Sequence, residues 1–574
     1  LLLITAYGYQ LDKAELVYST SGAATGVSYT DVAARMPAFD ILTVFAAIAA
    51  AFLVGAALTR TVWPLVLTLV LWGSASVALT GLYPEFVQRF QVTPNEFALE
   101  EPYIANNLKM TRLAFGLDKW NELQYNGEET LTAAAIAKDA ESFADARLWD
   151  YRPLQATLDQ LQTVRQYYNF ADVDVDRYEI NGRQRLMMLS ARELNPQRAL
   201  QSATWVNRHI AFTHGIGIAM VPVSGVADGG LPELVIRDIP PVSSDGAPVV
   251  SEPRIYFGEN VPDYSIIGGK SKTAVEFDYP DDTSASGQKN TTYAGKGGVP
   301  VGSLFNRLVF AIKYQEQRIL LSNLINSESK ILFNRNPRER VSKVAPWLTL
   351  DGDPYPAVID GKVKWIIDGY TTTAGYPYAH KTALSSATTD ALTARSNAVV
   401  AQADKTVNYI RNSVKATVDA YDGTVSIYQW DVSDPVLKTW SKAYPGVIKP
   451  KSEISKNLMS HLRYPEDIFK VQRDILSAYH VKTASAFYGG QDFWRVPRDP
   501  STFGGNVANQ PPYYTTMQLP GADQEAFMLT TPFVPRGGRE NLSAFAAVNA
   551  SPGKDYGKIT VLQLPRSTNI AGPT

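Results

Sequence analysis

The clearest pattern along the chain is a pair of long apolar stretches near its N-terminal end. Residues Ile41–Leu58 and Thr61–Pro84 carry no charged side chain. About 20 helical residues cross the ~30 Å hydrocarbon core of a bilayer, so both stretches qualify, the first only just. Because Thr59–Arg60 alone separates them, we expect residues 41–84 to form an antiparallel transmembrane hairpin with a very tight turn. A buried helical hairpin of a soluble protein is the alternative.

The residues before the hairpin carry further helical signals. Leu1–Ala6 starts inside an apolar run and lacks the layout of a signal peptide, so we expect residues 1–10 to be the end of a truncated transmembrane helix. Residues 11–40 are then an extracytoplasmic linker, with a short interfacial helix starting near Thr30. Arg60 in the turn favours a cytoplasmic turn, which places everything after the hairpin outside the cytoplasm.

After the hairpin, helical and strand-like patterns alternate irregularly. Apolar positions at helical spacing predict helices within Leu154–Tyr168, Leu304–Phe333 and Asp467–Tyr479. Asp360–Gly361 and Asp422–Gly423 stand next to strand-like runs and supply the positive φ angles of tight hairpin turns. The pattern therefore predicts a mixed α+β region.

We expect a membrane protein in which a transmembrane α-helical hairpin is followed by a large mixed α+β extracytoplasmic region. This region divides into residues 85–378 and 407–574. Between them, residues 379–406 are rich in Ala, Thr and Ser and lack aromatic residues, which favours an exposed, mobile insertion.

Composition narrows the possible functions. The chain has 574 residues and a net charge of −2, which gives no basic footprint for nucleic acid. Cysteine is absent, which excludes disulfides, thiol nucleophiles, Cys-ligated zinc and iron–sulfur clusters within this sequence. Charged residues make up 19%, below the ~25% of average soluble domains, in keeping with a membrane-embedded part.

Several familiar motifs are incomplete. Gly268–Ser271 resembles the end of a phosphate-binding loop, but Tyr264 stands where the first glycine is needed. No G-x-S-x-G nucleophile elbow occurs. His209 and His214 lie outside any H-E-x-x-H pattern, so a structural role is favoured for both. No catalytic residue is identified.

The strongest chemical signal is acidic. Asp172, Asp174 and Asp176 alternate with valines, and a strand would place all three on one face about 7 Å apart. Like charges so close require cationic partners, water or a hard cation. Ion pairing with a nearby arginine, or solvation, is the first interpretation, and a divalent cation such as calcium is the second. The candidate partners are Arg177, Arg183 and Arg185.

Two further polar groups are interpreted as structural. Asp351–Pro354 (DGDP) is typical of a turn rather than of a metal site. His461, with Arg463, Glu466 and Asp467 close behind it, is interpreted as a polar network or a helix start.

Six segments, spread in order along the chain, carry a family resemblance. They are Pro94–Asp118, Arg147–Leu154, Asp172–Gly182, Asp351–Tyr355, Asn408–Tyr421 and His461–Phe469. They resemble signature segments of the large bacterial membrane proteins grouped as uncharacterised protein family 0182. The resemblance implies several upstream membrane helices, a large extracytoplasmic region and further sequence downstream, so that both ends here are cut. It supplies no activity.

Two functions from different classes remain. The first is a scaffold or accessory subunit of a cell-envelope assembly, which forms a homo-oligomer or binds other envelope proteins and membrane lipid, but no nucleic acid. The second is an envelope-acting enzyme with a glycan or lipid substrate, or a transporter component. The first predicts a large buried interface, and the second a pocket that holds paired carboxylates.

Overall fold

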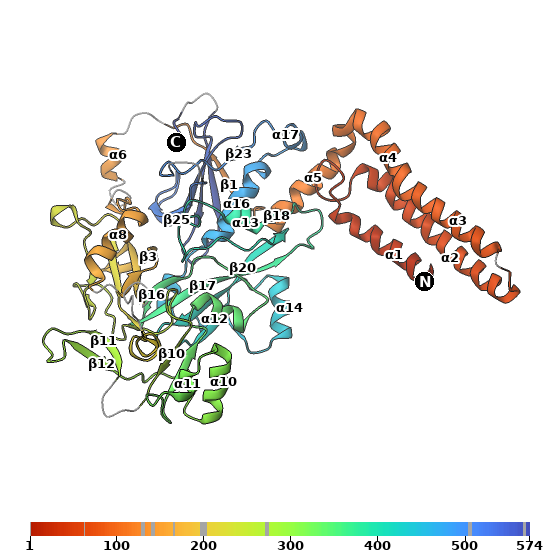
Figure 1. Cartoon of the computed structure of the whole chain (residues 1–574). Coiled ribbons are helices and arrows are strands. Elements are labelled where there is room, and N and C mark those ends of the chain that lie inside the picture. The colour runs from red at the N-terminus through yellow and green to blue at the C-terminus, as the bar shows by residue number, and fades with distance from the viewer. Residues whose placement is uncertain are drawn as a thin grey trace.

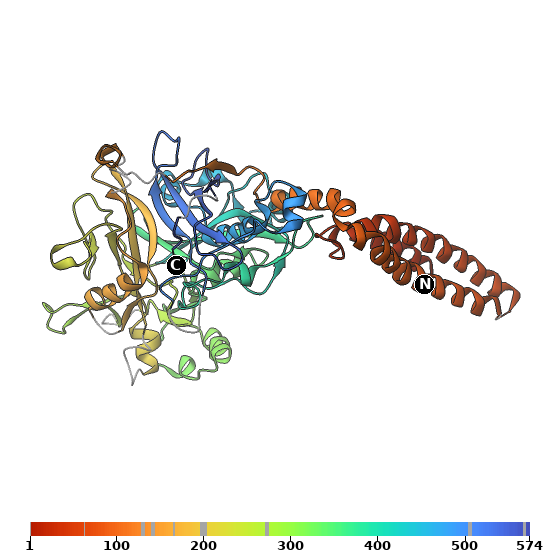
Figure 2. The ribbon, with the colours of Figure 1, turned by 90° about the horizontal axis from the view of Figure 1, so that it is seen from above.

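A helical rod projects from one side of a large mixed domain (Figures 1 and 2). This computed structural model describes residues 2–61, 63–127, 132–138, 144–164, 167–195, 204–269, 275–502, 508–565 and 570–573. The rod contains α1 (Leu2–Glu15), α2 (Met36–Thr59), α3 (Trp63–Val77) and α4 (Tyr83–Val87). Helix α5 (Glu96–Ala114) leads from the rod into the domain.

Two helices of the rod are long and apolar enough to cross a membrane. They run without a break over Asp31–Thr59 and Val66–Ala114. Arg60, in a left-handed conformation with φ of 56°, reverses the chain after α2, and α2 packs against both α1 and α3. Apolar side chains such as Leu58 and Trp63 are largely exposed, unlike those of a helical hairpin buried in a soluble core.

The segment before α2 differs from the expected separate interfacial helix. The chain is helical from Tyr29 and continues directly into α2. Ser28 and Asp31 bond reciprocally at this start, since each side chain accepts the backbone N–H of the other, at 2.9 and 3.2 Å. A wider π-type turn over Asp31–Arg35 precedes Pro37, so the missing N–H there does not end the helix. Helix α1 likewise extends past residue 10 to Glu15.

The domain is built on three large sheets among the described residues. The first has the order β1-β27-β26-β25-β23, with β24 beside β25. Its strands are β1 (Asn121–Gln124), β23 (Trp494–Arg495), β24 (Tyr513–Met517), β25 (Ala526–Pro535), β26 (Ala544–Asn549) and β27 (Ile559–Gln563). The parallel pairing of β1 with β27 joins the residues after the rod to the far end of the chain.

The second and third sheets are formed by the middle of the chain. The second has the order β15-β17-β20-β21-β22, and the third β2-β4-β6-β7-β8. The second comprises β15 (Thr349–Leu350), β16 (Tyr355–Ile359), β17 (Lys362–Thr373), β20 (Tyr409–Asp419), β21 (Val425–Gln429) and β22 (Ile448–Lys449). The third comprises β2 (Tyr168–Phe170), β3 (Asp174–Ile180), β4 (Arg183–Leu194), β6 (Ile218–Pro222), β7 (Ile236–Arg237) and β8 (Val242–Ser243).

Smaller sheets and helices complete the domain. The short strands are β5 (Gly215–Ile216), β9 (Arg254–Ile255), β10 (Tyr264–Ile267), β11 (Glu276–Pro280), β12 (Gln288–Thr291), β13 (Val299–Pro300), β14 (Lys330–Phe333), β18 (Thr382–Ala383) and β19 (Thr406–Val407). The helices are α6 (Ala133–Lys138), α8 (Tyr151–Gln162), α10 (Leu304–Tyr314), α11 (Arg318–Leu321), α12 (Pro337–Val344), α13 (Leu384–Thr388), α14 (Pro435–Ala443), α15 (Lys456–His461), α16 (Glu466–Tyr479) and α17 (Ala484–Gly489).

The local predictions were accurate where a strong turn or a buried helix decided the structure. Asp360 and Gly361 take φ of 53° and 76° between β16 and β17, which confirms that hairpin. Helix α16 is confirmed over nearly its predicted range. Two longer helical predictions were wrong in extent, because α8 ends at Gln162 and Leu304–Phe333 divides into α10, α11 and β14.

Residues 379–406 are packed into the domain, so the expectation of an exposed insertion was wrong. Ala379, Leu384, Ala391 and Val399 are buried, and Asp390 is completely buried. Strands β18 and β19 pair with each other and hold the two ends of the segment together. Small Ala, Ser and Thr side chains gave little hydrophobic signal, but they fit a segment that lies close against other elements.

Helix α16 is central to the main core of the domain. Its apolar residues Ile468, Phe469, Val471, Ile475 and Leu476 are buried with residues of α5, α8 and the first sheet. The charged residues of the same helix, Lys470 and Arg473, are buried as well. A buried charge requires nearby partners, and these partners lie at the candidate site.

Candidate metal-binding site

A pocket of about 100 Å³ lies beside the N-terminal ends of β3, α8 and α16. Its wall also includes residues of the 379–406 segment, among them Leu392 and Val399. The third and second sheets meet beside it, because the Tyr178 hydroxyl of β3 accepts the backbone N–H of Val358 in β16 at 3.1 Å.

Three carboxylates converge in this pocket. Asp172 precedes β3, Asp174 is the first residue of β3, and Asp353 lies in the turn between β15 and β16. Each offers a carboxylate oxygen, and these three oxygens lie within 4.8 Å of one another. Such spacing allows one ion to contact all three side chains. We call these residues the carboxylate trio.

The guanidinium of Arg463 contacts two members of the trio, but each of these two keeps a carboxylate oxygen without a hydrogen bond. Arg463 Nη2 donates to Asp174 Oδ1 at 3.0 Å and lies 3.6 Å from Asp353 Oδ2. Asp174 is 4% exposed, yet its Oδ2 has no hydrogen-bond partner among the described residues. Asp353 Oδ1 likewise has no hydrogen-bond partner among the described residues. A buried carboxylate oxygen without a partner is energetically costly, so the site favours an added positive charge.

More negative charge lies behind the trio. Glu193 accepts the backbone N–H groups of Glu259 and Asn260, while Glu259 Oε2 has no partner within the described part of the chain. Burial, and then repulsion from Asp172 and Glu193, raises the pKa of Glu259 well above its ordinary value. Carboxylates therefore outnumber cationic side chains around Arg463.

Burial and repulsion between like charges also raise the pKa values of the trio. Burial, followed by repulsion from Asp174, raises the pKa of Asp172 well above its ordinary value. Burial also raises the pKa of Asp174 to about 7, although Arg463 acts in the opposite direction. Burial and repulsion from Asp174 raise the pKa of Asp353. At neutral pH the trio must either hold protons or bind a cation.

The donor atoms define the kind of cation. All three are carboxylate oxygens, and no histidine joins them among the described residues. Hard cations such as Ca²⁺ and Mg²⁺ prefer oxygen ligands, whereas zinc sites commonly include His or Cys. Three carboxylates leave further coordination positions open for water or a ligand.

Of the three aspartates singled out from the sequence, the structure brings Asp172 and Asp174 together and places Asp176 elsewhere. Asp176 Oδ2 lies 2.7 Å from His461 Nδ1, and its Oδ1 accepts the backbone N–H of Arg177 at 2.7 Å. Residues i and i+2 on a regular strand stand about 7 Å apart. Asp172 lies outside β3, and this irregular start brings it nearer to Asp174.

Two of the three arginines expected as partners, Arg177 and Arg185, form other contacts. Arg177 donates to the carbonyl oxygens of Ser460 and Leu462, and Arg185 lies 3.9 Å from Asp145. The actual partner, Arg463, was assigned only to a polar network. Asp353 was missed as a site residue because its sequence, DGDP, fits a turn equally well. The turn does form, but nothing local shows that it faces β3.

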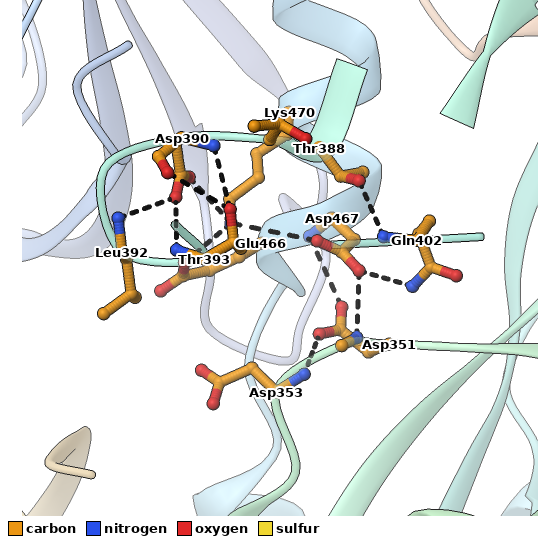
Figure 3. A network of polar contacts seen from close by, with 12 residues as sticks. Asp351, Asp353, Thr388, Asp390, Leu392, Thr393, Gln402, Glu466, Asp467 and Lys470 are labelled. Carbon is orange, nitrogen blue, oxygen red and sulfur yellow. Dashed lines mark hydrogen bonds and ion pairs between the residues drawn. The ribbon is translucent and has the colours of Figure 1, made fainter. Parts of the chain in front are cut away.

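A buried ion-pair network supports the site from α16 (Figure 3). Lys470 Nζ lies 2.8 Å from Asp390 Oδ2, and 3.8 Å from both Glu466 Oε2 and Asp467 Oδ1. Asp467 Oδ2 accepts the N–H of Gly352 at 2.9 Å and Gln402 Nε2 at 2.5 Å. The network thereby joins residues 390–402 to the turn that carries Asp353.

The other candidate motifs have structural contacts. His209 Nδ1 lies 3.0 Å from the Tyr264 carbonyl oxygen, and His214 Nε2 lies 3.2 Å from Asp278 Oδ1. Gly268 and Gly269 follow β10, while Lys270 and Ser271 lie outside the described residues.

Together these features define a chain with two helices capable of crossing a membrane and a large mixed domain with clustered carboxylates that are buried or half-buried. The chain belongs to the family described as Uncharacterised protein family (UPF0182), whose model matches residues 1–574. It is 46% identical to a UPF0182 protein of Streptomyces coelicolor over 99% of this chain and 57% of that protein. It is also 46% identical to one from Kineococcus radiotolerans, over 100% and 58%.

A UPF0182 protein of Thermobifida fusca is 42% identical over the whole of this chain and 62% of its own length. The chain thus spans about three-fifths of the curated relatives it matches. No solved structure matches it.

Proposed function

We propose that this chain is a membrane-anchored protein whose large domain binds a divalent cation, with Ca²⁺ as the preferred ion, at Asp172, Asp174 and Asp353. The observation that carries the proposal is the convergence of these carboxylates, together with a buried Asp174 Oδ2 that has no partner among the described residues. A cation there neutralises the excess negative charge and satisfies the unbonded oxygens.

Calcium suits the positions of the ligands. Asp172 lies before a strand and Asp353 in a turn, so both can adjust to the longer 2.3–2.6 Å bonds and variable geometry of Ca²⁺. Magnesium demands a nearly ideal octahedron at about 2.0–2.1 Å. The spacing of up to 4.8 Å between the oxygens agrees with the larger ion.

The setting we propose is a bacterial cell membrane, with α2 and α3 inserted and the large domain outside the cytoplasm. Exposed apolar side chains along both helices support insertion, and Arg60 at the tight turn supports a cytoplasmic turn. Extracellular calcium modules commonly bind with Kd of about 10⁻⁴–10⁻³ M. Three carboxylates partly neutralised by Arg463 are suited to such moderate affinity.

Calorimetric titration of Ca²⁺ into the detergent-solubilised chain tests the proposal. We expect one site whose affinity falls on the order of tenfold or more in Asp174→Asn, since one charged ligand is lost. Asp228→Asn is the matched control, because Asp228 is exposed and remote from the trio in sequence. Circular dichroism verifies that each variant is folded. Absence of Ca²⁺ binding by the folded wild-type chain overturns the proposal.

A second candidate function is a scaffold or accessory subunit that assembles with a second copy or with other envelope proteins. It is favoured by the exposed apolar side chains on α10 and α11, including Leu304, Phe305, Ile312 and Leu321. Exposed apolar side chains gathered on two helices in contact with each other are typical of interaction surfaces. Native mass spectrometry after gentle membrane extraction tests it. A complex that dissociates in Ile312→Glu supports this function, and a monomer in both proteins refutes it.

A further inference from the structure

We infer that the pocket beside the carboxylate trio binds the phosphate group of a water-soluble molecule, held between the trio's cation on one side and Arg147 with Tyr151 on the other. This inference rests on the proposed cation site and adds the chemical class of the ligand. It depends on groups that the cation itself does not use.

Hydrogen-bond donors without acceptors lie on the wall of the same pocket. The hydroxyl of Tyr151 is buried and has no partner among the described residues. Burial raises the pKa of Tyr151, so the hydroxyl keeps its proton and remains a donor. An acceptor from a bound molecule satisfies this group.

Two contacts orient the side chain of Arg147, but its hydrogen bond uses only one of its nitrogens. Its Nε donates to the carbonyl oxygen of Trp149 at 3.0 Å, and its guanidinium lies 5.1 Å from the centre of the Tyr513 ring. These contacts orient the group through Nε and the face of the guanidinium, and the hydrogen bond that it forms among the described residues does not use the terminal nitrogens. A guanidinium in this condition suits two oxygens of a phosphate.

The neighbouring Arg152 does not compete for this role. It forms paired bonds with Asp150, from Nε to Oδ1 at 2.8 Å and from Nη2 to Oδ2 at 3.0 Å. Arg463 is likewise engaged by Asp174 and by the carbonyl oxygen of Val175. Arg395 also lines the pocket, and its Nη2 donates to the Ser501 carbonyl oxygen at 3.4 Å. Arg147, which lies on the same wall as Tyr151, is the guanidinium that we assign to the anion.

The unbonded groups of the pocket are of two kinds. Carboxylate oxygens without donors belong to Asp174, Asp353 and Glu466, and the buried donor without an acceptor is the Tyr151 hydroxyl, with the Arg147 guanidinium on the same wall. A cation alone satisfies the first kind, and an anion alone is repelled by it. A cation with a phosphate satisfies both, because phosphate oxygens also fill the open coordination positions of Ca²⁺.

The volume and the position of the pocket limit the size and the source of the ligand. A pocket of about 100 Å³ is smaller than the ~300–1,000 Å³ that encloses a drug-sized molecule, so it admits a small head group while the rest of the ligand stays outside. Helix α8 and strand β3, which border the pocket, lie on the side of the domain away from α2 and α3 (Figures 1 and 2). A lipid head group in the membrane of α2 and α3 is therefore disfavoured.

The test uses methyl phosphate as the probe and the full chain in phosphatidylcholine nanodiscs. We expect calorimetry to show methyl phosphate binding that requires Ca²⁺, and a reciprocal gain in Ca²⁺ affinity when the probe is present. Arg147→Gln should weaken methyl phosphate binding on the order of tenfold, and Tyr151→Phe several-fold, with Ca²⁺ binding in the absence of probe unchanged. Arg208→Gln, at an exposed position, is the matched control.

The outcomes separate this inference from the cation site. Ca²⁺ binding without methyl phosphate binding, or methyl phosphate binding that ignores Ca²⁺ or Arg147→Gln, overturns the inference and leaves the cation site standing. Loss of Ca²⁺ binding in the wild-type chain overturns both. If phosphatidic acid added to the nanodiscs abolishes methyl phosphate binding, a lipid head group occupies the pocket and the assignment to a water-soluble molecule is wrong.

Discussion

Arg463 brings a positive charge into contact with the carboxylate trio. It is 3% exposed, contacts two members of the trio, and lies 3.8 Å from the centre of the Tyr355 ring. Tyr355 and the carbonyl oxygen of Val175 fix its position. Removal of its charge leaves Asp174 and Asp353 uncompensated, so the residue stabilises the fold as well as the site.

We predict that Arg463→Gln lowers the free energy of unfolding by about 3–5 kcal/mol without Ca²⁺, since a buried charge pair loses one partner. Saturating Ca²⁺ should restore part of this loss, because the ion supplies positive charge at the same place. Urea unfolding with and without Ca²⁺ measures both effects. Arg237→Gln, at an exposed ion pair, is the control. A loss that Ca²⁺ leaves unchanged contradicts the prediction.

His480 provides a pH-dependent contribution away from the site. Its ring stacks on Trp494 with centroids 3.4 Å apart, and Nδ1 lies 2.8 Å from the Leu476 carbonyl oxygen. Burial lowers the pKa of His480 to about 4. An unfolded histidine titrates near 6.5, so the unfolded state binds more protons between these two values.

Acidification through this range therefore favours unfolding. We expect His480 to contribute a loss of about 1 kcal/mol in the free energy of unfolding between about pH 7.5 and pH 5.5. His480→Gln removes the titrating group, so its stability should fall less over the same interval. Urea unfolding at the two pH values gives the comparison. Equal losses in both proteins would show that His480 does not titrate as described.

At the scale of elements, α16 and residues 390–402 act as one unit through Lys470 and Asp390. Asp390 Oδ1 also accepts the backbone N–H groups of Leu392 and Thr393, so the same carboxylate orders the start of the segment. The segment then closes one wall of the pocket with Leu392 and Val399. The ion pair consequently influences the shape of the pocket.

A double-mutant cycle measures this link. Lys470→Met should destabilise the chain by about 3–5 kcal/mol, since it leaves Asp390 buried and charged. The double variant Lys470→Met/Asp390→Asn should be more stable than the sum of the single changes implies, by about 0.5–3 kcal/mol. Limited proteolysis should cut residues 392–400 faster in Lys470→Met than in the double variant. Strict additivity would show that the two elements are independent.

Sequence patterns predicted the elements better than their assembly. Asp-Gly at residues 360–361 determines backbone angles locally, and α16 has a strong apolar face, so both were predictable. Asp353 and Arg463 join the site only because a turn of the second sheet and the start of α16 meet β3. That meeting depends on contacts between distant residues, which periodicity and spacing do not encode.

At the scale of the molecule, the helical rod and the domain are connected through α5, and the natural lack of cysteine in this chain allows a direct test of topology. We predict that Asp228→Cys reacts with a membrane-impermeant maleimide in intact cells, because we place the domain outside the cytoplasm. Arg60→Cys should react only after permeabilisation. The unsubstituted chain is the control, and the reverse pattern of labelling inverts the proposed orientation.

The parallel pairing of β1 with β27 has a consequence for biosynthesis. Asn121 pairs with Thr560, and Gln124 Nε2 donates to Gln563 Oε1 at 2.8 Å. Strand β1 is therefore translated early but can pair only after β27 has been translated. Closing so long a loop costs entropy and slows folding. During translation α2 and α3 emerge before β1, and β1 then lacks its partner strand until β27 has been made. Nearly the entire domain must therefore be translated before its first sheet can form completely.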